Sequence, residues 1–596
     1  MATSVLTRSY DNGRTGANTT ETVLTPALIA SKGLKRARSF ELRDGGFKDD
    51  PRLEAQPLYV PGIKMPDGNT HDVLFVASMG NFIWAFDVNG NSFWRTPQLG
   101  TPYKPAHDPH GNSPTATVID SWGINILWGI LATPVIDMDA KPNPQMYFVN
   151  WRLQNTGKPA LFAHRIDITT MQPVGQPVAV AASHPGPGPG GNAATLHPDQ
   201  KVRAAMLLVP LRGSKKTLFF STTGGEKEGA PHGWMVAIDV DTFTQTAAWV
   251  STPSSFGGGM WHASQGPAAD ANGNVYAITA NGGFHQDHKN NIVDFNGKTD
   301  FAEAIVRLKY TKTGGTASLT LDDWYIPFRD SDRKTDANYD YRDQDLGSAA
   351  PVLPLDNNLV FASGKDGILY VLDRNHLGKK IADSSVLKSP PIYITYNGIG
   401  LPSAVPSASP TGLPHPPDFD LGQPGDNPEK THHLHGSPVY WNGSAGPMLF
   451  TWGENESLRA WKVDTTTGGV TFVGRGAEVA SAALAFAPTG IGGMPGGMIC
   501  LTSNGQTPNT GIVWALAPID QDANHAVVEG IARAYDATNL DPTPIDPFTP
   551  RLKLLWDSKR LGITFNHSKF CTPMVADGRL FVPTYDGQVD MYIPNP

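Results

Sequence analysis

Histidines recur in this sequence at the points where short apolar runs begin. Three of them hold the same position relative to such a run: His262, His435 and His567. His433 lies two residues before His435, so both imidazoles point to one side of an extended chain. Converging imidazoles could hold Zn, Cu, Mn or Fe, with Gln56 or Asp345 as an oxygen ligand. These residues predict a histidine-rich metal centre, although no His-Glu-x-x-His or Cys-x-x-Cys spacing accompanies them.

Other polar residues recur beside the apolar runs in the same way. One set precedes the first run of a repeat and comprises Gln56, Arg203, His262, Asp345, His435 and His567. A second set follows the second run and comprises Arg152, His232, His285, His288, Lys365, Glu454, Asn504 and Asp586. If the runs are strands of one ring-shaped fold, both sets lie on one face and converge on its axis. Such a convergence is typical of a small-molecule site.

The composition favours a turn-rich β protein. The chain has 596 residues, of which 62 are Gly and 51 are Pro, and both residues interrupt helices. Only 17% of the residues are charged and 14 are Trp, which argues against disorder. The net charge is −8 and no block of Lys and Arg occurs, so we expect no nucleic-acid partner. No apolar stretch of about 18 residues occurs, so we expect no membrane span and a soluble protein.

The sequence gives little information about cellular location or oligomeric state. The first residues lack the apolar segment of a signal peptide, so we expect a cytoplasmic protein. If the chain is a mature form, the expectation is instead a periplasmic or secreted protein. The only cysteines, Cys500 and Cys571, lie in apolar runs and are expected to be buried free thiols. The oligomeric state does not follow from the sequence.

A repeated pattern defines the expected architecture. An apolar run with Pro is followed by a second β-rich run, a turn, Ala-x-Asp or a close variant, and often Trp. Strand-length runs in repeating four-run units are typical of a β-propeller. We predict an all-β fold with eight blades, with seven as the alternative. The last unit lacks its outermost strand, and residues near 36–42 are expected to supply that strand and close the ring.

The expected domain organisation is simple. Residues 1–35 form an N-terminal arm, and residues 36–596 form one propeller. Three insertions are expected. The first, at about 183–192, is rich in Pro and Gly, the second, at about 381–430, is rich in Pro and Ser, and the third, at about 519–546, lies inside the seventh unit.

At this point the repeats resemble those of the pyrroloquinoline-quinone (PQQ) propellers, the alcohol and membrane glucose dehydrogenase class. The segment from Gly364 to Arg374 is similar to one that carries a basic quinone contact in that family, which implies this role for Lys365. Trp261, followed by Asn274-Val275-Tyr276 and Thr279-Ala280-Asn281-Gly282, resembles the segment that supplies an aromatic floor and a calcium-ligand Asn. The resemblance thus implies these roles for Trp261 and Asn281.

The acidic run Asp343-Gln344-Asp345-Leu346-Gly347 resembles the one that carries the family's catalytic Asp, so Asp343 and Asp345 are both candidates. Arg203 is a further candidate for cofactor contact. The chain is also similar to a branch of propellers that carries the Lys365 segment and lacks the family's adjacent cysteine pair.

The resemblance implies an oxidoreductase that acts on an alcohol or sugar in an axial pocket, with PQQ and calcium as cofactors. Two alternatives remain open. One is a metal-centred propeller enzyme with lyase or copper-type redox chemistry, using His262, His435, His567, His433 and Gln56. The other is a binding or scaffold propeller without catalysis.

Overall fold

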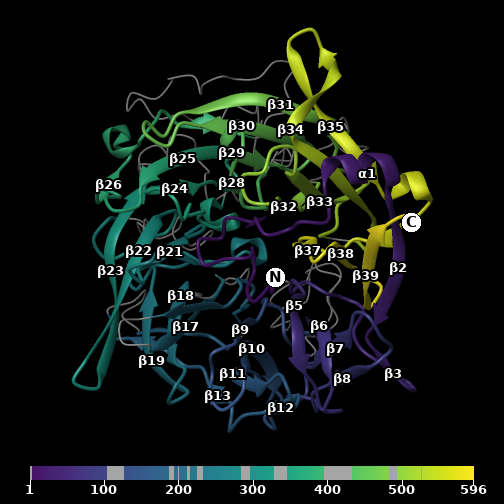
Figure 1. Ribbon diagram of the computed structural model, residues 1–596. Coiled ribbons are helices and arrows are strands. Elements are labelled where there is room, and N and C mark those ends of the chain that lie inside the picture. Colours follow the sequence, from purple (N-terminus) through teal and green to yellow (C-terminus); the bar gives the residue numbers. More distant parts are fainter. Residues whose placement is uncertain are drawn as a thin grey trace.

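The computed structural model describes residues 3–103, 127–186, 193–198, 200–210, 215–223, 232–282, 296–327, 345–394, 433–481, 493–524 and 526–596. Antiparallel sheets follow one another around a common centre, and the N-terminal segment crosses that centre (Figure 1). The predicted all-β propeller is confirmed. No helix among these residues is long and apolar enough to cross a membrane.

The first half of the ring consists of successive sheets in chain order. Their strands are β5 (Leu58–Lys64), β6 (Thr70–Ala77), β7 (Ile83–Asp87) and β8 (Phe93–Arg95); β9 (Val135–Asp137), β10 (Gln145–Leu153), β11 (Pro159–Asp167), β12 (Gln172–Pro173) and β13 (Val178–Ala179); β16 (Leu207–Pro210), β17 (Lys216–Ser221), β18 (Trp234–Asp239) and β19 (Thr244–Val250); and β20 (Ala268–Ala269), β21 (Val275–Ile278), β22 (Ile305–Thr313), β23 (Thr316–Ile326) and β26 (Lys380–Ile381).

The second half continues in the same order. Its strands are β24 (Leu359–Ala362), β25 (Ile368–Asp373) and β27 (Ile392–Tyr393); β28 (Val439–Gly443), β29 (Gly446–Thr451), β30 (Ser457–Val463) and β31 (Val470–Val479); β32 (Met498–Thr502), β33 (Ile512–Pro518), β34 (Glu529–Asp546) and β35 (Thr549–Asp557); and β37 (Met574–Ala576), β38 (Arg579–Pro583) and β39 (Gln588–Pro594). Because β31 pairs with β35, the sheets of two units merge into one. The number of sheets therefore does not give the number of blades, and the eight-bladed count stays a prediction.

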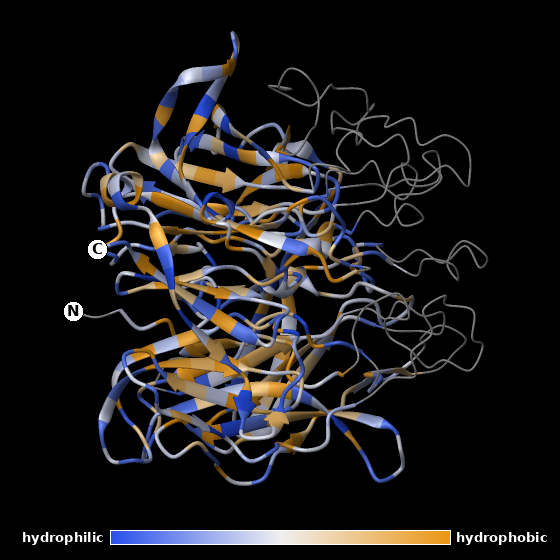
Figure 2. Ribbon diagram, turned by 90° about the vertical axis from the view of Figure 1, so that its right-hand side faces the viewer, coloured by the Kyte–Doolittle hydropathy of each residue, from blue (hydrophilic) through white to orange (hydrophobic). Residues whose placement is uncertain are grey.

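The middle strands are apolar on both sides because neighbouring sheets cover both of their faces. In β6, for example, Val73, Leu74, Phe75 and Val76 are all buried. A single four-stranded sheet cannot bury both faces, so the ring is what makes these continuous apolar runs stable. Apolar residues accordingly lie along the strands while hydrophilic residues mark the turns (Figure 2).

The ring is closed by an N-terminal strand, as predicted. β2 (Leu34–Glu41) pairs antiparallel with β39, from Leu34 opposite Pro594 to Glu41 opposite Gln588. It follows the short helix α1 (Pro26–Lys32), whose N-cap is Thr25.

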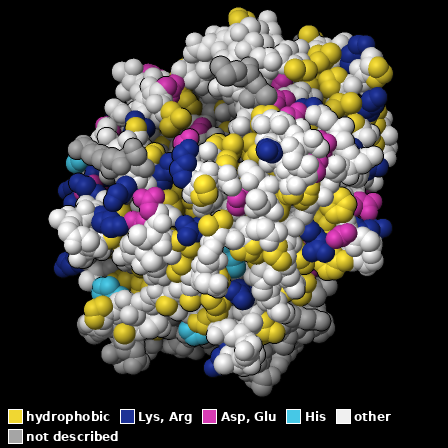
Figure 3. Space-filling model, turned by 60° about the horizontal axis from the view of Figure 1, so that its bottom comes forward, with side chains coloured by type: hydrophobic (Ala, Val, Ile, Leu, Met, Phe, Trp, Pro, Cys, Tyr) yellow, Lys and Arg dark blue, Asp and Glu magenta, His cyan; other side chains and the backbone are white. Residues whose placement is uncertain are grey.

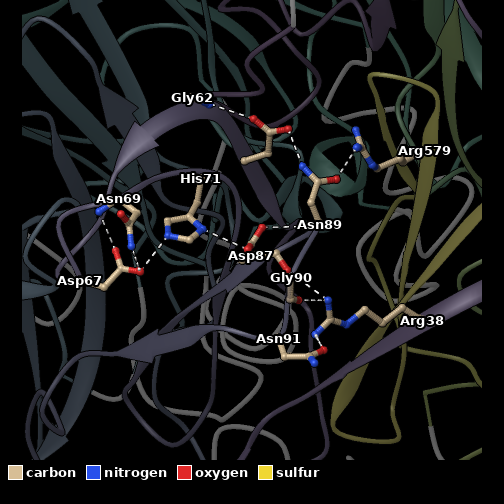
Figure 4. A network of polar contacts seen from close by, with 11 residues as sticks. Arg38, Gly62, Asp67, Asn69, His71, Asp87, Asn89, Gly90, Asn91 and Arg579 are labelled. Carbon is tan, nitrogen blue, oxygen red and sulfur yellow. Dashed lines mark hydrogen bonds and ion pairs between the residues drawn. The ribbon is translucent and has the colours of Figure 1, made fainter.

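Polar contacts reinforce this closure on the outside of the ring (Figure 4). Arg38 of β2 donates to the Gly90 carbonyl and, at 3.2 Å, to the side chain of Asn91. Arg579 of β38 donates to Asn89 at 2.7 Å. The turn between β7 and β8 is thereby tied to two strands of the closing sheet.

An N-terminal segment, residues 5–18, pairs with the innermost strands. Val5 exchanges two backbone hydrogen bonds with Tyr59 of β5, and β1 (Ala17–Asn18) pairs with β32. Further backbone carbonyls of the segment accept from the inner strands: Leu6 from Ile136, Asn12 from Ala269, Gly13 from Leu353, Thr15 from Tyr440 and Gly16 from Leu501. The inner edges of the sheets, which would otherwise present unpaired backbone groups, thus find partners in the arm.

Side chains of the segment complete these contacts. Asn12 donates to the Leu208 carbonyl of β16 at 2.8 Å, and Val575 of β37 donates to the Tyr10 hydroxyl at 3.0 Å. Arg14 is fully buried and donates to the carbonyls of Pro267, Met206 and Arg8 at 2.9 Å each.

We expect Arg14→Ala to lower the free energy of unfolding by about 3 kcal/mol or more, because several buried carbonyls lose a charged donor. Chemical denaturation followed by fluorescence measures the loss. Arg43→Ala is the control, because Arg43 pairs with Glu41 on the surface and such pairs contribute about 0–1 kcal/mol. Equal effects of the two substitutions would contradict a stabilising role for the segment.

Candidate functional site

The candidate site is built where the loops that enter the inner strands meet at the axis. Lys365 Nζ lies 2.7 Å from Asp345 Oδ2, and both side chains are buried. The backbone N–H of Asn281 donates to Asp345 Oδ1 at 3.1 Å, so both oxygens of the carboxylate are held. Lys365 Nζ also lies 5.5 Å from the ring centroid of Trp261, as in a cation–π contact. Four residues singled out in the sequence are therefore neighbours.

A glycine permits this arrangement. The turn that carries Lys365 packs directly on the entry loop, and the Lys365 N–H donates to the Asp345 carbonyl at 3.0 Å. A Cβ at Gly364 would lie 2.4 Å from the Leu346 carbonyl oxygen and 2.7 Å from that of Asp345. Only glycine allows the two backbones to approach so closely, so Gly364 fixes Lys365 beside Asp345.

The structure adds an acidic residue that the sequence analysis did not single out. Glu303 is fully buried, and its Oε2 accepts from the Leu346 N–H at 2.8 Å. Its own N–H donates to the Ala280 carbonyl at 3.1 Å, so Glu303 lies beside the segments of both Asn281 and Asp345. The sequence does carry a signal, because Glu303 is the only charged residue in the apolar run 301–306. A buried carboxylate is costly unless it has a hydrogen-bond or charge partner, so its presence there indicates such a partner.

Two of the predicted histidines meet on a carboxylate. His435 Nε2 lies 2.6 Å from Glu454 Oε1, and His433 Nδ1 lies 3.8 Å from Glu454 Oε2. The three residues are buried, and one ligand atom of each lies within 4.8 Å of the others. Burial, followed by the charge of Lys365, lowers the pKa of His435 well below its ordinary value.

His262 and His567 lie outside this cluster. His262 Nε2 is 2.9 Å from the Ile278 carbonyl oxygen, and burial lowers the pKa of His262 to about 4. Burial likewise lowers the pKa of His567 to about 3. In the described part of the chain, the ring contacts of His435 are with Trp261, Phe570 and His433 instead.

Basic side chains lie next to Phe570, whose ring contacts that of Trp261. The rings of Trp261 and Phe570 are 5.7 Å apart, and Arg203 lies 5.0 Å from the Phe570 centroid. Arg203 also pairs with Glu54, whose other oxygen lies 3.6 Å from Arg52. Lys569 Nζ is 5.1 Å from the Phe570 centroid. Of this group, only Arg203 was singled out for cofactor contact.

The remaining predicted residues have local roles or lie elsewhere. Gln56 Oε1 accepts from Thr572 Oγ1 at 3.1 Å, which joins the first and last inner strands. Asp343, His285 and His288 lie outside the described residues. Cys500 and Cys571 are free and buried, as expected.

An outer groove of about 960 Å³ is a separate feature. Residues of β17, β18, β22 and β23 contribute to its lining, and two of its cations are paired: Lys312 with Asp239 at 2.5 Å and Arg307 with Asp322 at 2.6 Å. On the face in Figure 3, basic, acidic and apolar side chains are interspersed. None of the sequence-predicted site residues lines this groove, so the axis remains the candidate site.

The comparisons with known proteins support the fold. No protein-family model matches the chain, and no curated protein matches its sequence. The chain is similar in structure to the quinohemoprotein alcohol dehydrogenase of Comamonas testosteroni, with a TM-score of 0.50 and 13% identity over 99% of this chain and 80% of that one. It is also similar to a europium-containing methanol dehydrogenase, with a TM-score of 0.50 and 13% identity over 93% of this chain and 85% of that one. At this identity the likeness shows a shared propeller fold.

His567 generates a prediction about pH. Its pKa is about 3 in the folded protein and 6.5 ordinarily, so the unfolded chain binds an extra proton between these values. Its contribution to stability is therefore lost as the pH falls below 6.5. We expect His567→Leu to reduce the loss of unfolding free energy between pH 7 and 4.5 by about 2 to 3 kcal/mol.

Denaturant titrations at each pH measure this slope. His376→Leu, which removes an exposed histidine, is the control and is expected to leave the slope as in the native protein. An unchanged slope in His567→Leu would show that His567 titrates normally in the folded state.

Proposed function

We propose that the protein is an oxidoreductase that acts on the hydroxyl group of an alcohol or sugar in the axial site, with PQQ and calcium as cofactors. The observation that carries the proposal is the buried Lys365–Asp345 pair beside the indole of Trp261. In this combination the carboxylate can accept a proton from the substrate, the aromatic face can stack on a planar ring, and the cation can offset the negative charge of that ring.

The described residues fit such a cofactor. Trp261 is only partly buried, so its ring can contact a planar ligand. Lys365 lies beside this ring, while Arg203 and Lys569 lie beside the neighbouring ring of Phe570, and such positive charge suits a quinone bearing carboxylates. The side-chain oxygens of Asn281 and Glu303 belong to adjoining segments and are of the type that calcium prefers.

When bound, the quinone supplies a hydride acceptor, and calcium supplies a Lewis acid. The protein's own part is to place the proton acceptor. Asp345 receives hydrogen bonds on both oxygens, from Lys365 and from the Asn281 N–H, so its position is fixed before substrate arrives. We assign Asp345 as the general base for the substrate hydroxyl and Lys365 as the residue that orients it. Asp343 remains an alternative base.

Two substitutions test the assigned roles. We expect Lys365→Gln to weaken PQQ binding about 10- to 100-fold, because a charged hydrogen bond is lost. We expect Asp345→Asn to keep the quinone but to lower turnover about 10²- to 10⁴-fold, because general-base catalysis is lost. Near-ultraviolet absorbance and calorimetry during titration with PQQ and calcium measure binding, and a dye-linked alcohol assay measures turnover.

The matched control is Lys380→Gln, which removes an exposed lysine that pairs with Asp383. It is expected to bind and turn over as the native protein does. If the native protein retains neither quinone nor calcium, the dehydrogenase proposal fails, and a binding or scaffold propeller becomes the better interpretation.

A further inference from the structure

His433, His435 and Glu454 form a donor set that the proposed quinone chemistry does not use. Their ligand atoms lie within 4.8 Å of one another and are buried. Two imidazoles and one carboxylate are the ligands of catalytic zinc sites and of non-haem iron sites, both of which leave a coordination position open. The set therefore has the chemistry of a metal centre for a divalent first-row transition ion.

The distances are compatible with one ion. Around a tetrahedral zinc ion, with bonds of about 2.0–2.2 Å, ligand atoms lie about 3.3 Å apart. The separation is 2.6 Å between His435 Nε2 and Glu454 Oε1, and 3.8 Å between His433 Nδ1 and Glu454 Oε2. The two distances involve different oxygens of Glu454, and one ligand atom of each of the three residues lies within 4.8 Å of the others, so side-chain rotations would have to shorten the longer separations.

The backbone holds the three residues in place. His433 and His435 are two residues apart on the chain that leads into β28, and the centroids of their rings lie 5.7 Å apart. Glu454 follows β29, and its N–H donates to the His433 carbonyl at 2.9 Å. Because this bond connects the entry loop with the turn of the same sheet, the donors stay together without a ligand.

The charges nearby permit a cation. Lys365 and Lys569 act on His435 electrostatically and would oppose a metal ion. Asp345 pairs with Lys365 at 2.7 Å and offsets the first of these charges, while Glu454 supplies a negative charge within the cluster itself.

A histidine on the outer rim shows why this geometry is specific. His71 also contacts two carboxylates, but it uses opposite ring nitrogens: Nδ1 lies 3.0 Å from Asp87 and Nε2 lies 3.0 Å from Asp67 (Figure 4). The two carboxylates therefore lie on opposite sides of the imidazole ring. One metal ion cannot be bound by the ring and by both carboxylates at once. His71 is therefore a suitable control.

We propose that His433, His435 and Glu454 bind one divalent transition-metal ion, of the zinc or iron(II) class, beside Trp261. This site is distinct from the oxygen donors assigned to calcium, and the inference does not rest on the proposed dehydrogenase activity. The ring of His435 lies 5.6 Å from that of Trp261, so the ion would adjoin the axial site.

The test uses the full chain after treatment with a chelator, with Co²⁺ as the spectroscopic probe and Zn²⁺ as the competitor. We expect one Co²⁺ per chain, visible ligand-field absorption, and displacement by Zn²⁺. His433→Ala and Glu454→Gln are each expected to weaken Co²⁺ binding by at least about 10- to 100-fold, since even outer-sphere changes have effects of this size. Glu454→Gln keeps the shape of the side chain, so it guards against loss of folding in His433→Ala.

The control His71→Ala is expected to bind Co²⁺ as the native protein does. Circular dichroism and the thermal midpoint establish that each variant is folded. The proposal is overturned if the native chain binds no Co²⁺, or if folded His433→Ala and Glu454→Gln bind it with native affinity. The quinone titration is independent, so failure of one site does not count against the other.

Discussion

The innermost strand of each sheet presents an edge to the axis of the ring, and backbone groups on such an edge need partners. The segment of residues 5–18 supplies many of them, meeting strands from β5 to β37 in turn. Between most neighbouring sheets of a propeller, side-chain packing is the main contact. Here one continuous piece of backbone connects the inner edges, so the position of each sheet depends on all the others.

This constraint bears directly on the axial site. The loops that carry Asp345, His435 and Arg203 lead into strands that the segment holds, so their side chains meet at defined distances. Buried polar and charged groups are costly unless they have partners, and each of these residues has one: Lys365 for Asp345, Glu454 for His435 and Glu54 for Arg203. The pairing lets a polar site exist at the centre of an apolar ring before a ligand arrives, which is the usual requirement for precise binding.

The sequence predicts the repeating sheets well because each repeat carries its own apolar runs and turns. It also places Lys365, Asp345, Trp261 and Asn281 at one site, through a resemblance and through the topology of a ring. It does not predict which histidines converge. Equal positions in different blades imply comparable height along the axis but say nothing about side-chain direction.

Local backbone geometry decides that direction. His262 has a φ of +48°, a left-handed conformation that its sequence does not signal, and its ring contacts the Ile278 backbone. His433 and His435 lie on a strand entry whose alternation the sequence does show. The position of Glu303 could not be predicted for another reason. Its hydrogen-bond partners are the backbone groups of Leu346 and Ala280, which are distant from it in the sequence. A contact between distant segments leaves no local pattern to detect.

The closure of the ring has a consequence for how the chain is made. Nearly the whole ring lies between β2 and its partner β39 in the sequence. Because synthesis runs from the N-terminus, β2 finds this partner only after the strands between them have been made. Contacts of such large sequence separation form slowly. Until the pair forms, the edge of β2 that faces β39 has no partner and is open to other chains, so closure of the ring also protects the protein against aggregation.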